Sequence, residues 1–289
     1  MIFDWLIAPF LDYAFMARAL AGALAVSLGA APVGVFLMLR RMSLTGEAIA
    51  HGVLPGIAVA YLLAGLSLFA MTIGGLVAGL VIATLSALVS RLTVLREDAS
   101  LASFHLVALA MGVLLVSVAG SKVDLIHVLF GSVLALGDGA VLLLAGSATL
   151  TVVVLALIYR PLVMESYDPA FLRAVGGRGA LVHHLFLALV VLNLVAGFHA
   201  LGTLMSVGMM ILPATAARFW ARGIGGMIGA SVAAAVLASV VGLLVSFHID
   251  VPSGPAIILV AGAASMVSML LGPHGSLRAL RTPAWHRSN

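Results

Sequence analysis

The chain is a succession of long apolar runs separated by short breaks that hold arginine, acidic residues, glycine or proline. A helix needs about 20 mostly apolar residues to cross a bilayer. Nine segments meet this requirement and are predicted to be membrane spans: residues 16–39, 47–65, 70–90, 100–119, 139–159, 181–198, 201–219, 225–246 and 254–271. A further apolar stretch, Ile126–Leu136, is too short to cross, and we expect it to be re-entrant or interfacial.

The composition agrees with a chain that lies mostly in lipid. Hydrophobic residues make up 63% of the 289 positions and charged residues only 8%, whereas soluble domains average about 25% charged residues. The few aromatics and the lack of alternating ten-residue segments exclude an outer-membrane barrel. We therefore expect an all-α fold, a polytopic transmembrane helical bundle in a single domain over residues 1–289. About nine spans are predicted, with eight or ten as the alternatives.

The basic residues predict how the bundle is oriented. When the break after the first span is placed inside, the inner segments hold 12 of the 14 basic residues, namely Arg40, Arg41, Arg91, Arg96, Arg160, Arg173, Arg178, Arg218, Arg222, Arg278, Arg281 and Arg287. Only Arg18 and Lys122 are then outside. Because cytoplasmic loops carry the excess of Lys and Arg, we predict the N-terminus outside and the C-terminus in the cytoplasm. Residues 273–289 then form a basic cytoplasmic tail.

Several kinds of chemistry are excluded by what the sequence lacks. It has no cysteine, so disulfides, thiolate metal ligands and cysteine nucleophiles are absent. The pI of about 10.1 could suggest nucleic-acid binding, but arginines scattered between apolar runs are typical of membrane orientation, and we expect no nucleic-acid partner. Residues 1–13 lack a basic n-region, so we expect no cleaved signal peptide.

The sequence also argues against an ATPase activity of the chain itself. A Walker-type phosphate-binding loop needs a lysine after its second glycine, and the only lysine is Lys122, on the predicted outer side. We therefore expect a transport subunit, not an enzyme. Either a partner subunit hydrolyses ATP, or an ion gradient or passive flow drives transport.

The strongest candidate site is a carboxylate and an imidazole at the start of the second span. Glu47 and His51 stand four residues apart, so on a helix they share one face. An ionisable side chain in a membrane helix is costly and is a functional candidate by default. Oxygen and imidazole ligands suit zinc or manganese, and we place zinc first. The alternative is an ion pair or hydrogen bond that holds neighbouring helices together.

A second group of polar residues falls on the predicted outer face. Its members are His199, His248, Asp250, Asp124 and His127. Histidines and carboxylates around an outer mouth could receive a divalent cation. The alternative is that they are ordinary solvated loop residues.

The predicted cytoplasmic loop over residues 160–180 contains a short helix. Asp168 is a good N-cap, Pro169 suits the first helical position, and Gly176 with Gly177 would end the helix after Val175. We expect this helix to display Phe171, Leu172 and Arg173 to the cytoplasm. Since so short a helix is marginal in water, we expect it to dock into a partner's groove or to lie on the lipid surface.

Four blocks of the chain resemble the permeases of the ABC-3 family, the membrane subunits of bacterial zinc and manganese importers. Met42–Gly56 (MSLTGEAIAHGVLPG) resembles the second-helix signature of that family. The other three blocks are Tyr167–Gly176, Gly202–Arg218 and Asp250–Ala256, and all four follow the family order.

The resemblance implies an importer of the bacterial inner membrane with two permease copies, two cytoplasmic ATP-binding subunits and a periplasmic metal-binding protein. It implies that Glu47 and His51 line the metal path, that the metal is transported and not permanently bound, and that residues 160–180 form the loop that couples to the ATPase. The coupling residues would be Asp168, Pro169, Phe171, Leu172, Arg173 and Gly176. The family more often has aspartate where Glu47 stands, and the extra methylene moves the carboxylate by about one bond length.

Two other functions compete with this reading. A stand-alone, ion-coupled divalent-metal carrier would need no ATPase and usually shows inverted repeats, which the sequence does not suggest. An intramembrane metallohydrolase would need a motif such as H-E-x-x-H, which the Glu47–His51 pair does not form.

Overall fold

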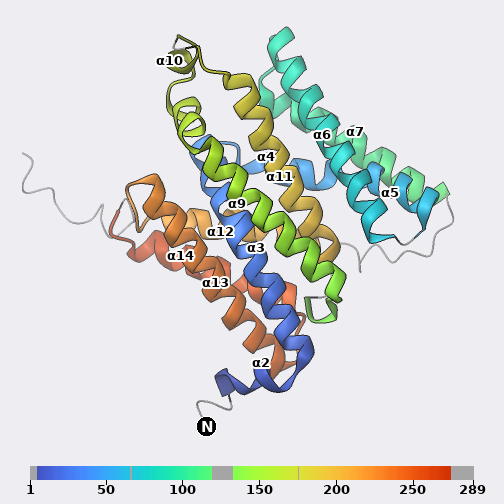
Figure 1. Ribbon diagram of the computed structural model, residues 1–289, viewed down its shortest axis with the longest axis vertical. Helices are drawn as coiled ribbons and strands as arrows, with labels where there is room; N and C mark the ends of the chain where they lie inside the picture. The colour runs from blue at the N-terminus through green and yellow to red at the C-terminus, as the bar shows by residue number, and fades with distance from the viewer. Residues whose placement is uncertain (1–4, 66, 119–132, 175, 275–289) are drawn as a thin grey trace, which may run out of the picture.

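The structure, a computed structural model, describes residues 5–65, 67–118, 133–174 and 176–274 (Figure 1). The part that it describes is helical and contains no strand. The elements are α2 (Ala8–Asp12), α3 (Ala14–Leu39), α4 (Ser43–Gly52), α5 (Leu54–Ala64), α6 (Leu68–Leu92), α7 (Glu97–Val118), the 3-10 turn η1 (Val133–Ala135), α9 (Asp138–Tyr167), α10 (Pro169–Ala174), α11 (Gly179–Leu201), α12 (Thr203–Arg218), α13 (Ile224–Ile249) and α14 (Ser253–Leu271).

Each of the nine predicted segments coincides with a helix. Seven helical segments within the described residues are long and apolar enough to cross a membrane: α3, α4 with α5, α6, α9, α11, α13 and α14. The other two are shorter, since the apolar part of α7 is Ala99–Leu115 and α12 has 16 residues. The all-α membrane fold is thereby confirmed. The count of nine and the sidedness of the termini stay predictions. Of the stretch Ile126–Leu136 only the end is described, and the tail beyond residue 274 lies outside the described residues.

The long helix α3 is the centre of the bundle. It packs against α9 on one side and against α12 and α13 on the other. Most of its residues are buried, which is expected of a helix that is apolar all round. Its backbone lies very close to that of α12 at Gly34, where a β-carbon would lie 1.7 Å from the carbonyl oxygen of Met210. Only glycine allows the two backbones to approach so closely.

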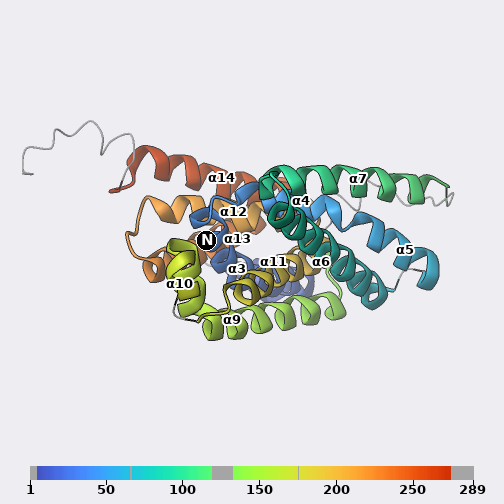
Figure 2. The same cartoon turned by 90° about the horizontal axis from the view of Figure 1, so that it is seen from above.

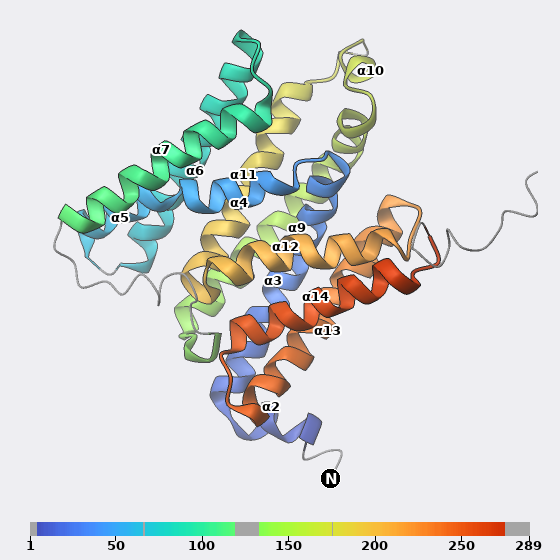
Figure 3. The same cartoon turned by 180° about the vertical axis from the view of Figure 1, so that it is seen from behind.

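Two groups of helices flank this centre. Helices α5, α6 and α7 lie at one end of the bundle and α12, α13 and α14 at the other, as the view from above shows (Figure 2). Helix α11 connects the groups because it packs on both α6 and α12. Seen from behind, α4 crosses between the groups near the middle of the molecule (Figure 3). This position gives α4 neighbours on both sides.

The second predicted span is a broken helix, of which α4 is the first part. The break falls at Val53, and Pro55 lies in the first turn of α5, where its missing N–H costs nothing.

The turn between α3 and α4 is equally tight. Arg41 adopts the left-handed conformation, with φ of 59°. The amide of Met42 donates to Leu37 O at 2.8 Å and that of Arg41 donates to Met38 O at 3.1 Å. These two bonds form a Schellman motif with arginine at the position usually held by glycine.

Candidate metal site

Helix α4 places Glu47 and His51 on one face, as their spacing predicts. The Glu47 side chain is exposed in the single chain, whereas His51 is half-buried. The Nδ1 atom of His51 is buried and has no hydrogen-bond partner among the residues that the structure describes. A buried polar atom without a partner is unfavourable by about 1–3 kcal/mol, so His51 has a hydrogen-bonding atom that the described chain leaves unsatisfied.

Glu47 and His51 both line two cavities, one on each side of α4. The first, of about 470 Å³, lies between α4 and α7 and is lined by Arg41, Met42, Ser43, Leu44, Thr45, Glu47, Ala48, His51, Leu101, Ala102 and His105. The second, of about 440 Å³, lies towards α12 and α14 and is lined by Glu47, Ala50, His51, Thr203, Leu204, Val207, Gly208, Ile211, Leu212 and Ile258. The pair therefore stands between two spaces that are large enough to hold water or a hydrated ion.

His105, which the sequence analysis did not single out, lies in the same first cavity. It comes from the apolar part of α7, and its Nδ1 atom is also buried without a hydrogen-bond partner in the described chain. Helix α7 packs on α4 here, and a β-carbon on Gly52 would be in ordinary van der Waals contact with the His105 β-carbon, at 3.9 Å. The rule that selected Glu47, an ionisable residue within an apolar run, could have found His105 as well.

The residues of this cavity do not form a finished metal site. Within the residues described, no three histidine or acidic side chains lie close enough together to hold one metal ion. What the arrangement offers is a carboxylate and two imidazoles that share one cavity without binding one another. Such a set can bind a divalent cation weakly or in combination with ligands from another chain.

The predicted outer group is only partly visible. The ring of His248 stacks on Trp5 with centroids 4.3 Å apart, and its Nδ1 donates to Leu244 O at 2.8 Å. Asp250 is exposed at the end of α13 with a left-handed backbone. His199 lies in α11, but its side chain is outside what the structure describes, as are Asp124 and His127. A metal-receiving role for this group stays a prediction.

The predicted cytoplasmic helix is present as α10. The Asp168 carboxylate caps it by accepting a hydrogen bond from the Phe171 amide at 2.9 Å. The helix ends near Gly176, which has φ of 76°, and the Gly177 amide donates to Leu172 O at 2.8 Å. The side chains of Pro169 and Arg173 lie outside the described residues.

The prediction that Leu172 faces the cytoplasm is wrong. Phe171 is 50% exposed, but Leu172 is only 4% exposed. The reason is the close return of the chain after α10, since a β-carbon on Gly177 would lie 2.4 Å from a methyl carbon of Leu172. Leu172 is thus an anchor of α10, and Phe171 is the side chain that α10 presents outwards.

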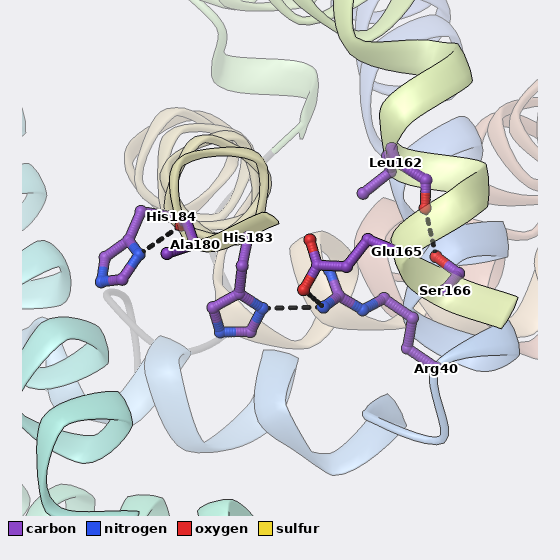
Figure 4. Close-up of polar contacts among 7 residues, drawn as sticks. All are labelled: Arg40, Leu162, Glu165, Ser166, Ala180, His183 and His184. Atoms are coloured by element: carbon purple, nitrogen blue, oxygen red, sulfur yellow. Dashed lines mark hydrogen bonds and ion pairs between the residues drawn. The ribbon is translucent and has the colours of Figure 1, made fainter. Parts of the chain in front are cut away.

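A buried polar cluster that the sequence did not reveal joins three helices beside this loop (Figure 4). Arg40 Nη2, at the end of α3, donates to Glu165 Oε1 of α9 at 3.3 Å and to His183 Nδ1 of α11 at 2.8 Å. The guanidinium carbon also lies 5.2 Å from the centre of the Phe186 ring, a cation–π contact. Because arginine can only donate, Nδ1 of His183 is the acceptor in this contact. We call Arg40, Glu165 and His183 the inner cluster.

Comparison with known proteins gives the family. The profile of the ABC 3 transport family matches residues 12–272, which is nearly the whole chain. The chain belongs to this family. The manganese import system permease protein ScaB of Streptococcus parasanguinis is 33% identical to this ABC 3 permease over 272 residues, or 93% of this chain and 96% of the relative. The manganese transport system membrane protein MntC of Halalkalibacterium halodurans is 31% identical over 264 residues, or 91% of this chain and 89% of the relative.

Solved structures give the same result for the fold. PsaBC from Streptococcus pneumoniae, solved in complex with Fab, matches this ABC 3 permease with a TM-score of 0.85 and 31% identity, covering 98% of this chain and 100% of that one. An inward-facing metal-chelate type ABC transporter matches with a TM-score of 0.70 and 17% identity, which indicates a shared fold alone. This ABC 3 permease is a multi-pass transport protein of the plasma membrane.

Proposed function

We propose that this chain is the membrane subunit of an ATP-driven importer of manganese, and that the cation passes Glu47 and His51 on α4. The observation that carries the proposal is the pair itself: a carboxylate and an unpartnered imidazole, one turn apart on a membrane helix, between two cavities. Carboxylate and imidazole ligands suit Mn²⁺ as well as Zn²⁺.

We propose manganese as the transported cation, whereas the sequence analysis placed zinc first. The relatives ScaB and MntC are both named as manganese permeases. The imidazoles of the cavity do not oppose this choice, because imidazole binds many first-row divalent ions and selection depends on geometry and availability.

A second copy of the chain would complete the site. Glu47 and its neighbour Leu44, 77% exposed, both face outward in the single chain. A carboxylate that faced hydrocarbon would be costly by several kcal/mol. A homodimer that covers this face of α4 would remove that cost and could bring the two Glu47–His51 pairs towards one path.

Two further partners, an ATP-binding subunit and a metal-binding protein, would contact opposite ends of the bundle. Helix α10, with exposed Phe171, would dock on a cytoplasmic ATP-binding subunit, since the chain has no phosphate-binding loop of its own. A binding protein would deliver the cation to the opposite face. ATP binding and hydrolysis would then expose the Glu47–His51 pair alternately to the two sides of the membrane.

The test is uptake of radioactive Mn²⁺ by cells that lack other manganese importers and express the whole system. Glu47→Ala and His51→Ala should each abolish uptake while leaving the amount of permease in the membrane unchanged. Normal uptake by both variants would remove the pair from the path. Uptake that persists after the partner ATPase is inactivated would instead favour a stand-alone carrier.

A further inference from the structure

The first cavity contains a second histidine that the proposed path does not use. His105 lines this cavity together with Glu47 and His51, but it comes from α7 and lies 54 positions after His51 in the sequence. Its position therefore reflects the packing of α7 on α4 and not the local sequence around the metal signature.

The surroundings of His105 do not explain it as a structural residue. Its Nδ1 is buried and has no hydrogen-bond partner among the residues described, whereas buried polar atoms almost always have one. The histidines of the cytoplasmic end of α11 behave differently: His183 Nδ1 accepts from Arg40, and His184 Nδ1 donates to Ala180 O at 2.6 Å. These two histidines of α11 thus have hydrogen-bond partners, whereas Nδ1 of His105 has none in the described chain.

We propose that His105 binds the transported divalent cation on the α7 wall of the first cavity, as a further ligand beside the Glu47–His51 pair. The inference rests on the proposed function, because it assumes that the cation enters this cavity. A neutral imidazole has one nitrogen lone pair for a metal, and His51 and His105 each have a buried nitrogen that forms no hydrogen bond with the residues described.

The separation of the ligands fits transport better than storage. No three of these groups lie within reach of one ion in the described chain, so His105 acts as a neighbouring position that the cation occupies in turn. Conduction requires binding that is strong enough to admit an ion and weak or divided enough to release it. A tight three-ligand site would hold the metal.

The first experiment measures radioactive Mn²⁺ uptake by the complete transporter with His105→Gln, which keeps a polar side chain of similar size but removes the imidazole. Loss of a group that supports a bound metal typically lowers affinity about 10–100-fold, so we expect uptake at low Mn²⁺ to fall by about tenfold or more. His184→Gln is the matched control, a helical histidine outside both cavities, and should transport normally.

The pattern across variants separates the two proposals. Normal uptake by His105→Gln, with uptake abolished in Glu47→Ala and His51→Ala, would overturn the role of His105 alone. Normal uptake in all three would overturn the proposed path and this inference with it.

A second measurement is independent of transport activity. Because the chain has no cysteine, His105→Cys introduces a single thiol that a cationic methanethiosulfonate reagent can label in membranes. Mn²⁺ should slow the labelling of His105→Cys but not that of Leu106→Cys, whose position on α7 does not line the cavity. Equal rates with and without Mn²⁺ would place position 105 off the path, even if His105→Gln reduces the amount of assembled protein.

Discussion

The molecule contains two polar clusters of similar composition. They differ in whether the carboxylate is paired with a positively charged side chain. The inner cluster joins α3, α9 and α11 through Arg40, Glu165 and His183, with the Arg40 and Glu165 side chains only 10% and 13% exposed. The cavity between α4 and α7 holds Glu47, His51 and His105; the carboxylate is exposed, and each imidazole has a nitrogen without a hydrogen-bond partner in the part of the chain that is described. Each cluster contains a carboxylate and histidine, but only the inner one contains a cation of its own in contact with the carboxylate.

This difference is the one expected between polar groups that hold helices together and the polar groups of the proposed metal path. In the inner cluster the guanidinium supplies the positive charge that a buried carboxylate needs, and the helices are held together. In the cavity Glu47 forms no ion pair with a described side chain, although Arg41 lines the same cavity. The inner pairing is not complete, since Glu165 Oε2 is buried and has no hydrogen-bond partner in the described residues.

The sharpest test of the comparison is to remove the charge that the inner cluster contains. Arg40→Ala leaves the Glu165 carboxylate buried without its cation, and breaking a buried pair in this way destabilises proteins by about 3–5 kcal/mol. The denaturant concentration at which the purified permease unfolds in mixed micelles should therefore be markedly lower than for the wild type. Glu47→Ala, which removes an exposed carboxylate without a partner, should leave the same transition in place; an equal loss of stability in both variants would abolish the distinction.

A double replacement sharpens the same point. Arg40→Met combined with Glu165→Leu replaces the buried pair by apolar side chains of similar volume, which is often neutral or stabilising by about 1–4 kcal/mol. We expect the double variant to recover most of the stability that Arg40→Ala loses, measured in the same unfolding assay. Failure to recover would mean that contacts of Arg40 other than the pair, such as that with Phe186, hold the helices together.

The two neighbouring residues of α10 offer a smaller contrast of the same kind. Leu172→Ala removes a buried anchor, for which core truncations cost about 2–5 kcal/mol, and should increase proteolysis of the loop between α9 and α11.

Phe171→Asp should leave the loop folded but detach the ATP-binding subunit on purification. An intact complex in Phe171→Asp would count against docking through α10.

The smallest effect is expected at the cap of α10. Asp168→Asn keeps an oxygen that can accept from the Phe171 amide, whereas Asp168→Ala removes it at a cost of about 1 kcal/mol. Hydrogen exchange of the α10 amides should increase in the alanine variant and stay close to wild type in the asparagine variant. Equal exchange in the two would mean that the cap contributes nothing to the local stability.

The sequence predicted what depends on local pattern. Each expected span coincides with a helix because apolar length is a property of consecutive residues, and α10 was found because Asp168 and Gly176 are local signals. The inner cluster could not be found this way, since Arg40 meets residues 125 and 143 positions away. Counting arginines had treated Arg40 only as an orientation charge.

The residues of the candidate site also differ in whether local sequence or packing between distant segments brings them together. Glu47 and His51 lie four residues apart, so helical geometry alone joined them. His105 could have been selected by the same rule of an ionisable residue in an apolar run, but its place in the cavity of this pair depends on the packing of α7 on α4. The burial of Leu172 likewise depends on the return of the chain at Gly177, a contact that no periodicity within α10 contains.

The tight turn between α3 and α4 has a mechanical consequence. Arg40 belongs to the inner cluster, and Arg41, the next residue, lines the cavity of the candidate site. One peptide unit therefore separates the contacts of Arg40 with α9 and α11 from the wall of this cavity, and the two backbone hydrogen bonds of the Schellman motif fix the turn between them. A tilt of α4 relative to α3 would therefore change the backbone torsion angles in this turn or break one of these two hydrogen bonds.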